Sequence, residues 1–261
     1  MNQEVDVVNS QLQLSSALQR IGLLKVQHGD QAGALAAYKE GLEIVRKIVA
    51  EPNANPAAQQ DLQRFLQSIA GVELMGGDQA GGLSAYEEGA SIARKLMAQD
   101  HGNAQAQGDM MFNLKGIAYV KLQQNDHAGA LAAYLEFNDI YRSLASQDPG
   151  NPQTQRQLVE MLGFESGVAS LARNYPTALS LAEEAIVLEP NTLSLQIARA
   201  RALMLLGKTD EARKIYMDYR GKAIQGGTTW EQAIRDDFAA LRKAEIKDEL
   251  MSEIEVAFAK R

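Results

Sequence analysis

A pattern of 21 residues occurs three times in this chain, and successive copies lie 48 residues apart. The first copy, residues 29–49, reads GDQAGALAAYKEGLEIVRKIV, and the others span residues 77–97 and 125–145. A fixed period of roughly 20 to 50 residues is typical of repeat proteins, in which each unit buries its apolar face only against its neighbours. The period therefore predicts an array of similar units and not one globular core.

Each repeat is expected to contain two helices. Ahead of each copy, apolar residues recur at spacings of four and three, which places them on one face of a helix. In the three repeats these residues are Leu14, Leu18 and Ile21, then Leu62, Leu66 and Ile69, and then Met110, Leu114 and Ile117. The copy itself forms the second helix, so the pattern favours an all-α protein.

The turn between the two helices has its own signature. A Gly or Asn is followed by Asp in each repeat, at Gly29-Asp30, Gly77-Asp78 and Asn125-Asp126. Gly and Asn tolerate the left-handed backbone that ends a helix, and Asp caps the start of the next one. Pro56 and Pro152 then mark the first turn of the following repeat.

The repeats resemble the tetratricopeptide repeat, a helix-turn-helix of about 34 residues with small residues and an aromatic at set positions. The small position of the first helix is filled by Gly22, Ala70, Ala118 and Ser166, and the alanine position of the second by Ala34, Gly82, Ala130 and Ala178. Tyr38, Tyr86 and Tyr134 fill the aromatic position, whereas Ala182 stands there in the fourth unit. The resemblance implies a right-handed α-α superhelix, or solenoid, of antiparallel helix hairpins.

Compared with a repeat of 34 residues, the period of 48 adds about seven residues to each helix. Seven residues make nearly two helical turns, so the apolar stripe stays on the same face of the helix. The later units return to a spacing of 34, as from Ala178 to Ala212. We expect an array over residues 1–225, with units at about 8–55, 56–103, 104–151, 152–190 and 191–225.

Residues 226–261 are expected to form a helical pair that caps the array. Thr228 and Glu231 have the spacing of a capping box. Two apolar stripes follow, formed by Trp230, Ile234, Phe238 and Leu241 and then by Ile246, Leu250, Ile254 and Phe258. No such cap precedes the first repeat, so an uncovered apolar edge is expected near Leu14 and Leu18.

Composition excludes several classes of function. The net charge of -7 is concentrated in residues 1–190, and an acidic array repels phosphate, so nucleic acid is not an expected partner. The chain has no cysteine, its first residues lack the basic and apolar regions of a signal peptide, and no apolar run is long enough for a membrane span. We therefore expect a soluble, cytoplasmic protein without a membrane partner.

No residue pattern of a catalytic or metal site occurs in the sequence. His28, His101 and His127 lie far apart and in or beside turns, and GxSxG and HExxH are absent. The glycine-rich residues 75–82 lack the Lys-Ser/Thr of a phosphate-binding loop. The acidic pairs Glu87-Glu88 and Glu183-Glu184 are interpreted as solvated helix faces. The sequence predicts no enzyme, no cofactor and no bound metal.

Two recurrent features have a structural and a functional interpretation. Tyr38 and its equivalents could stack a ligand, but in the resembled family this position packs between helices, and core packing is favoured. Arg46-Lys47 and Arg94-Lys95 could form a basic ridge, but basic residues commonly complement the negative end of a helix, and this interpretation is favoured.

The resemblance also implies a groove lined by the first helix of each hairpin. The groove positions are Ser16, Gln19 and Leu23, then Arg64, Gln67, Gly71 and Met75, then Phe112, Lys115, Tyr119 and Gln123, and finally Arg201. Aromatic anchors, amides and isolated cations suit an extended peptide or an amphipathic helix. They do not suit the carboxylate clamp of chaperone-tail binders, because Gln19, Leu23 and Ser68 stand at the clamp positions.

We therefore expect a non-catalytic scaffold for protein–protein interaction, such as the adaptor or sensor region of a larger bacterial protein. One alternative is a module that associates with further copies of itself through the edge near Leu14 and Leu18. Another is a receptor for a peptide signal, although such receptors usually carry a DNA-reading domain, which this sequence does not supply.

Overall fold

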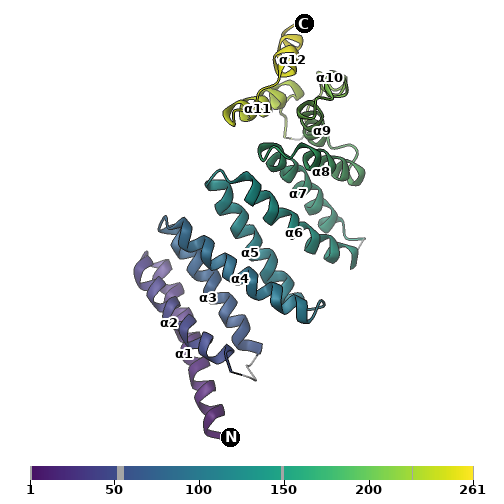
Figure 1. Cartoon of the computed structure of the whole chain (residues 1–261). Coiled ribbons are helices and arrows are strands. Elements are labelled where there is room, and N and C mark those ends of the chain that lie inside the picture. The colour runs from purple at the N-terminus through teal and green to yellow at the C-terminus, as the bar shows by residue number, and fades with distance from the viewer. Residues whose placement is uncertain (1, 52–55, 148–149, 225, 261) are drawn as a thin grey trace. The chain divides into compact units, whose positions relative to one another are not determined.

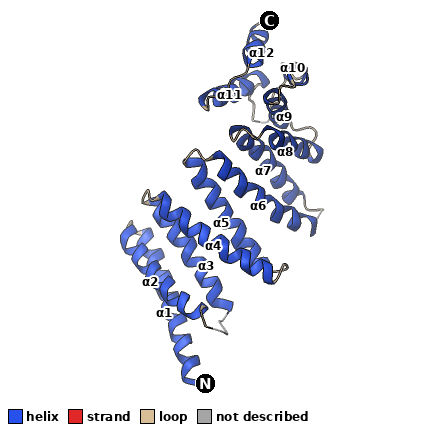
Figure 2. Ribbon diagram, viewed as in Figure 1, coloured by secondary structure: helices blue, strands red, loops and turns tan. Residues whose placement is uncertain are grey.

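The computed structural model describes residues 2–51, 56–147, 150–224 and 226–260. These ranges contain twelve α-helices and one isolated antiparallel bridge, between Ala223 and Thr229. The prediction of an all-α protein is confirmed in this described part of the chain (Figure 2). The chain divides into two compact units, residues 1–123 and 124–261, and each is treated separately below.

Consecutive helices pack on one another from α1 to α5 in the first unit and from α6 to α10 in the second, as in a solenoid of helix pairs (Figure 1). The first unit contains α1 (Asn2–Gln27), α2 (Gln31–Val49), α3 (Pro56–Met75), α4 (Gln79–Gln99) and α5 (Ala104–Gln123). The second contains α6 (His127–Gln147), α7 (Pro152–Leu171), α8 (Tyr175–Leu188), α9 (Leu193–Leu205), α10 (Thr209–Asp218), α11 (Trp230–Lys243) and α12 (Glu249–Ala259). The division falls between the two helices of the third expected repeat.

Helix length follows the period of the sequence. The helices α3, α5 and α7 each have 20 residues, whereas α8 and α9, which lie where the spacing returns to 34, have 14 and 13. A helix of 20 residues is about 30 Å long, against about 20 Å for one of 13 or 14. The long repeats therefore present a longer face to any molecule that binds along their helices.

The turns have the predicted conformations. Gly29, Gly77 and Asn125 adopt positive φ angles of 78°, 83° and 58°. The following Asp accepts a hydrogen bond from a backbone N–H three residues later, as between Asp30 and Gly33 at 2.8 Å and between Asp78 and Gly81 at 2.9 Å. These bonds satisfy donors that the first turn of a helix leaves free.

Tyrosine packing organises the core of the first unit. The ring of Tyr38 lies so close to Gly22 that a Cβ there would be 2.3 Å from it, and the ring of Tyr86 lies similarly against Gly116, at 2.5 Å. Both tyrosines are buried, and Tyr38 also contacts Phe65 edge to face. The interpretation of these two tyrosines as core residues is confirmed.

The core of the second unit includes both apolar stripes of the last two helices. Trp230 and Phe238 of α11 and Ile254 of α12 are buried together with Tyr216 of α10. The indole Nε1 of Trp230 donates a hydrogen bond of 2.8 Å to the backbone oxygen of Tyr216. The last two helices are therefore joined to α10 by buried packing.

The capping box expected at Thr228 is wrong by one residue. The helix α11 is capped by Thr229, whose hydroxyl accepts a hydrogen bond from the backbone N–H of Gln232. The carboxylate of Glu231 accepts instead from the backbone N–H of Gly221, at 2.7 Å. Glu231 thus fastens the loop that precedes α11, and does not close its first turn.

The expected edge near Leu14 and Leu18 is only partly exposed. Leu14 is 50% exposed, but Leu18 is only 8% exposed because it faces the interior of the unit. The other exposed large apolar residues of α1 are Val7, Ile21, Leu23 and Leu24. Leu18 is therefore a core residue and not part of an open edge.

Candidate functional site

The first helices of the three hairpins lie side by side in the first unit. The side-chain amide of Gln19 on α1 donates a hydrogen bond of 2.8 Å to the hydroxyl of Ser68 on α3. The side chain of Asn113 on α5 donates one of 3.2 Å to Gln63 on α3, and Asn113 is fully buried. These polar contacts join α1, α3 and α5. The contact between α3 and α5 is the more constraining one, because the buried amide of Asn113 would be costly to leave without a partner.

We call the outward-facing side chains of these three helices the candidate surface. It consists of Ser16, Gln19 and Leu23 on α1, Arg64, Gln67, Gly71 and Met75 on α3, and Phe112, Lys115, Tyr119 and Gln123 on α5. All of them are exposed or half-buried. The structure thus brings together, in one unit, all the groove residues expected from the sequence except Arg201.

Large apolar side chains occur on each of the three helices. Leu23, Met75, Phe112 and Tyr119 are each between 50% and 55% exposed. Phe112 and Tyr119 are seven residues apart and therefore lie on the same side of α5. Single exposed apolar residues are ordinary, but several on adjacent helices are typical of interaction surfaces.

The exposed ring of Phe112 packs on the buried ring of Tyr86. Its centroid lies 6.1 Å from that of Tyr86, with the planes tilted by 58°. Burial raises the pKa of the Tyr86 hydroxyl, so this group stays neutral under ordinary conditions. A buried, neutral tyrosine thus supports an exposed phenylalanine, which reduces the entropy that Phe112 would lose on binding a partner.

The polar part of the surface combines amides and cations. The guanidinium of Arg64 pairs with Asp61 one turn earlier on α3. Gln67 donates to the carboxylate of Asp109 at 3.4 Å, and Gln105 donates to the same carboxylate at 3.2 Å. Burial raises the pKa of Asp109, while these hydrogen bonds and the charge of Arg64 act against the rise.

Gly71, in the candidate surface, and Gly108, one turn before Phe112, leave space beside the larger side chains. A Cβ built on Gly71 of α3 or on Gly108 of α5 would meet no atom within 4 Å. Both glycines are therefore free of steric demands from the fold, and they expose helix backbone between larger side chains. A bound chain can approach the helices more closely at such positions than beside a side chain.

Arg201 lies apart from the candidate surface. It belongs to α9 of the second unit, and its side chain is largely buried. Its guanidinium pairs with Asp237 of α11 and donates a hydrogen bond of 3.1 Å to the hydroxyl of Ser170 on α7. Arg201 thus joins three helices of the second unit, which is a structural role.

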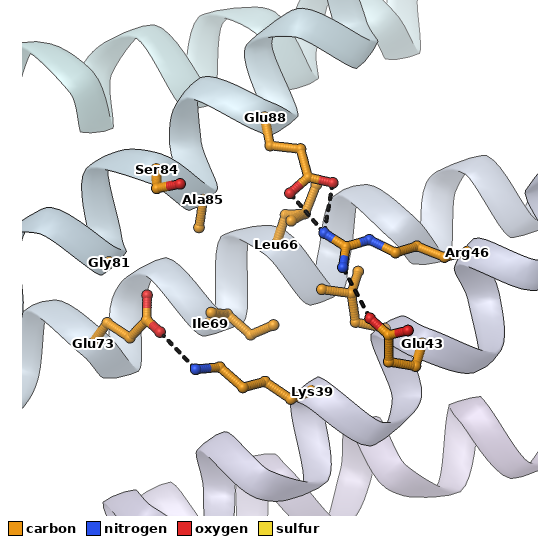
Figure 3. A pocket seen from close by; sticks show the side chains of 11 residues that line it. Lys39, Glu43, Arg46, Leu66, Ile69, Glu73, Gly81, Ser84, Ala85 and Glu88 are labelled. Atoms are coloured by element: carbon orange, nitrogen blue, oxygen red, sulfur yellow. Dashed lines mark hydrogen bonds and ion pairs between the residues drawn. The ribbon is translucent and has the colours of Figure 1, made fainter.

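The sequence analysis missed a set of ion pairs between neighbouring hairpins. Arg46 of α2 pairs with Glu88 of α4, and Lys39 of α2 pairs with Glu73 of α3 at 3.1 Å (Figure 3). These residues line a hollow of about 280 Å³. Its charges are paired with one another, so the hollow is better explained by packing between repeats than by a ligand.

An equivalent of the Arg46 pair occurs in the second unit. Arg142 of α6 donates from Nε and Nη2 to the two carboxylate oxygens of Glu184 on α8, at 2.9 and 2.8 Å. Arg46 and Glu88 are separated by 42 residues, and so are Arg142 and Glu184. This recurrent separation in the sequence could have indicated the two ion pairs. Glu88 and Glu184 remain partly exposed, as their interpretation as solvated helix faces requires, but both are also partners in ion pairs by which the two arginines join repeats.

The second unit also contains a fully buried carboxyl group. Glu165 of α7 accepts a hydrogen bond from the side-chain amide of Asn138 on α6, and both residues are buried. Burial raises the pKa of Glu165 to about 7, although the Asn138 hydrogen bond and the charge of Arg142 lower it. Glu165 occupies the repeat position of Ile21, Ile69 and Ile117, and this replacement of an apolar residue was the hint in the sequence.

The described residues offer neither a metal site nor a membrane span. They contain no group of three or more His, Asp or Glu side chains that could hold a metal ion. His28, one of the three histidines, contacts the backbone oxygen of Leu24 at 2.7 Å through Nδ1. Within the same described ranges, every helix is too short or too polar to cross a bilayer.

Fold and surface together define a helical-repeat protein with an exposed, mixed apolar and polar face in its first unit. No family model matches the chain, and no curated protein matches it in sequence. Among solved structures it is similar to tetratricopeptide repeat proteins.

Three of these structures illustrate the likeness. The TPR2AB-domain:pHSP90-complex of yeast Sti1 is 13% identical, with a TM-score of 0.34, over 94% of this chain and 86% of that one. The thermophilic TPR protein TTC0263 of Thermus thermophilus is 15% identical, with a TM-score of 0.31, over 88% and 98%. A tetratricopeptide repeat protein from Parabacteroides merdae ATCC 43184 is 13% identical, with a TM-score of 0.37, over 95% and 100%.

Proposed function

We propose that this chain is a non-catalytic scaffold that binds a peptide or a partner helix on the candidate surface of its first unit. The observation that carries the proposal is the exposure of Leu23, Met75, Phe112 and Tyr119 on three helices that are joined by the hydrogen bonds of Gln19 and Asn113. A rigid face with apolar anchors is what a short apolar motif requires for binding.

The chemistry of the surface also defines the class of ligand. Lys115 lies between Phe112 and Tyr119 on α5, and Arg64 lies on the adjacent helix. Cations beside aromatic anchors favour a peptide that carries an acidic residue next to a large apolar one. The amides of Gln67 and Gln123 can bond to the main chain of an extended peptide.

The experiment is a selection from a displayed peptide library, followed by binding measurements with variants. Lys115→Glu combined with Tyr119→Ala removes one anchor and reverses one charge at exposed positions. We expect this variant to lose binding of the selected peptides by about a hundredfold or more while keeping its helicity.

Lys95→Glu on α4 is the matched control, since Lys95 is also exposed but lies outside the candidate surface. Peptides that bind the double variant as tightly as the unchanged chain would place the site elsewhere. Equal losses in the double variant and in the control would show a general effect of charge.

A further inference from the structure

A second apolar strip lies on α1, away from the candidate surface. Val7, Leu14 and Ile21 follow one another at intervals of seven residues, and Ser10, Ala17 and Leu24 each follow three residues later. This is the a and d pattern of a coiled coil, and we call these six residues the α1 seam. Its four large residues are between 44% and 55% exposed.

The seam faces away from α3. Gln19, which contacts Ser68 of α3, lies about 140° around the helix from Leu14 and about 160° from Ile21. The seam therefore lies on the side of α1 opposite to α3. A shallow hollow of about 330 Å³ lined by Val7, Ser10, Gln11 and Leu14 opens on this side.

From this geometry we infer that the α1 seam binds the α1 seam of a second copy of this chain, with the two helices antiparallel. An antiparallel pair brings each a residue opposite a d residue of the other helix. Leu14 then faces Ala17 of the second copy, and Ile21 faces Ser10 of the second copy. Each large residue of these layers meets a small one, so the layers have similar volume and pack without voids.

A parallel pair fits less well. It would place Leu14 against Leu14 and Ile21 against Ile21, while Ala17 would face Ala17 and leave a gap. A twofold antiparallel contact also uses the same residues on both copies, as a closed dimer requires. Size complementarity therefore favours a second copy in the antiparallel direction.

The described charged residues of α1 favour the same direction. Arg20 and Lys25 both lie in the second half of the helix. A parallel pair places these like charges together, whereas an antiparallel pair separates them.

The first test measures molar mass by light scattering across a wide range of concentrations. The unchanged chain is expected to form dimers as concentration rises. Leu14→Glu combined with Ile21→Glu is expected to raise the dissociation constant by about a hundredfold or more, because each substitution occurs twice in a symmetric dimer. Circular dichroism checks that helicity is retained, as expected for exposed positions.

Leu23→Glu is the matched control. Leu23 lies on the same helix and is equally exposed, but it is about 180° around α1 from Leu14. We expect it to leave the dimer intact. A chain that stays monomeric at every concentration, or a dimer that Leu23→Glu disrupts as much as the seam variant does, overturns the inference.

A second test determines direction and uses the absence of cysteine from the chain. Val7→Cys and Leu24→Cys are made separately, and each is oxidised alone and in a mixture of the two. Antiparallel pairing places Val7 opposite Leu24 of the second copy, so a cross-linked dimer is expected only in the mixture. Cross-linking of each variant with itself, and not with the other, shows a parallel pair and contradicts the proposal.

Discussion

The Nη2 atom of Arg46 lies 2.7 Å from each of the two carboxylate oxygens of Glu88, on the next long hairpin. Arg46 also donates from Nη1 to Glu43 at 2.9 Å. The pKa of Arg46 is raised, mainly by the hydrogen bond with Glu88, whereas burial of the guanidinium acts to lower it. One guanidinium thus joins α2 to α4 at the position where Arg142 joins α6 to α8.

We expect Arg46→Glu to destabilise the chain by about 1 kcal/mol. The pair is about 40% exposed on both sides, so solvent screens much of its Coulomb energy. The reversal places a third carboxylate beside those of Glu43 and Glu88, which adds repulsion.

The double variant that exchanges the two residues, Arg46→Glu with Glu88→Arg, is expected to recover part of this loss. Lys47→Glu is the control, because Lys47 is next to Arg46 but more exposed, and it should change the stability little. Chemical denaturation measures each effect. Equal stability of the single and the exchanged variant would show that the pair makes no net contribution.

Tyr86→Ala is expected to cost on the order of 3 kcal/mol, as is typical of large-to-small truncation of buried aromatics. The ring fills the space above Gly116, so its loss leaves a cavity between α4 and α5. Gly116→Ala tests the same contact from the other side, because the new Cβ would be 2.5 Å from the ring.

Tyr119→Ala is the control for the tyrosine, since this residue is exposed and its loss should change stability by less than about 0.5 kcal/mol. Thermal or chemical denaturation compares the three variants. A melting curve of Tyr86→Ala that matches that of Tyr119→Ala would show that Tyr86 is not a core residue.

The stability of the second unit is expected to fall as pH rises. The pKa of Glu165 is raised from 4.5 to about 7 in the folded chain, so the folded state holds a proton that the unfolded state has released. The stabilisation by this proton is fully present below about pH 4.5 and is lost as pH rises through about 7. Each unit by which the pKa is raised corresponds to about 1.4 kcal/mol, so the free energy of unfolding falls by about 3 kcal/mol at most.

Glu165→Gln is expected to remove this dependence, because it keeps the shape of the side chain without the charge. Glu165→Ile also removes the charge, but it leaves the buried amide of Asn138 without its acceptor, so this variant is expected to be less stable than Glu165→Gln. Denaturation at a series of pH values between about 5 and 8 gives the slopes. Parallel slopes for the unchanged chain and Glu165→Gln would assign the dependence to other groups.

The period of the sequence predicts much of this structure because helix formation and helix ends depend on local chemistry. Asp30 and Asp78 cap their helices as expected, and Pro56 and Pro152 stand at the start of α3 and α7. The spacing of the apolar residues Trp230, Ile234, Phe238 and Leu241 likewise identifies the buried face of α11. Each of these features is decided within one or two helical turns.

Features that depend on packing between helices could not be predicted. Leu14 and Leu18 belong to one apolar stripe in the sequence, but only the direction of the neighbouring helices makes one exposed and the other buried. Arg201 was placed in a groove by its position in the repeat, and its partner Asp237 lies outside the array pattern. The pairing of Arg46 with Glu88 likewise requires the distance between two helices that no local pattern contains.

We propose that the partner binds on the face formed by α1, α3 and α5. A photoreactive amino acid in place of Tyr119 tests it directly, with the same substitution at Val187 of α8 as the control, because Val187 is 79% exposed and lies outside that face. We expect a selected peptide to be cross-linked from position 119 and not from position 187. Cross-linking from position 187 alone would contradict this proposal.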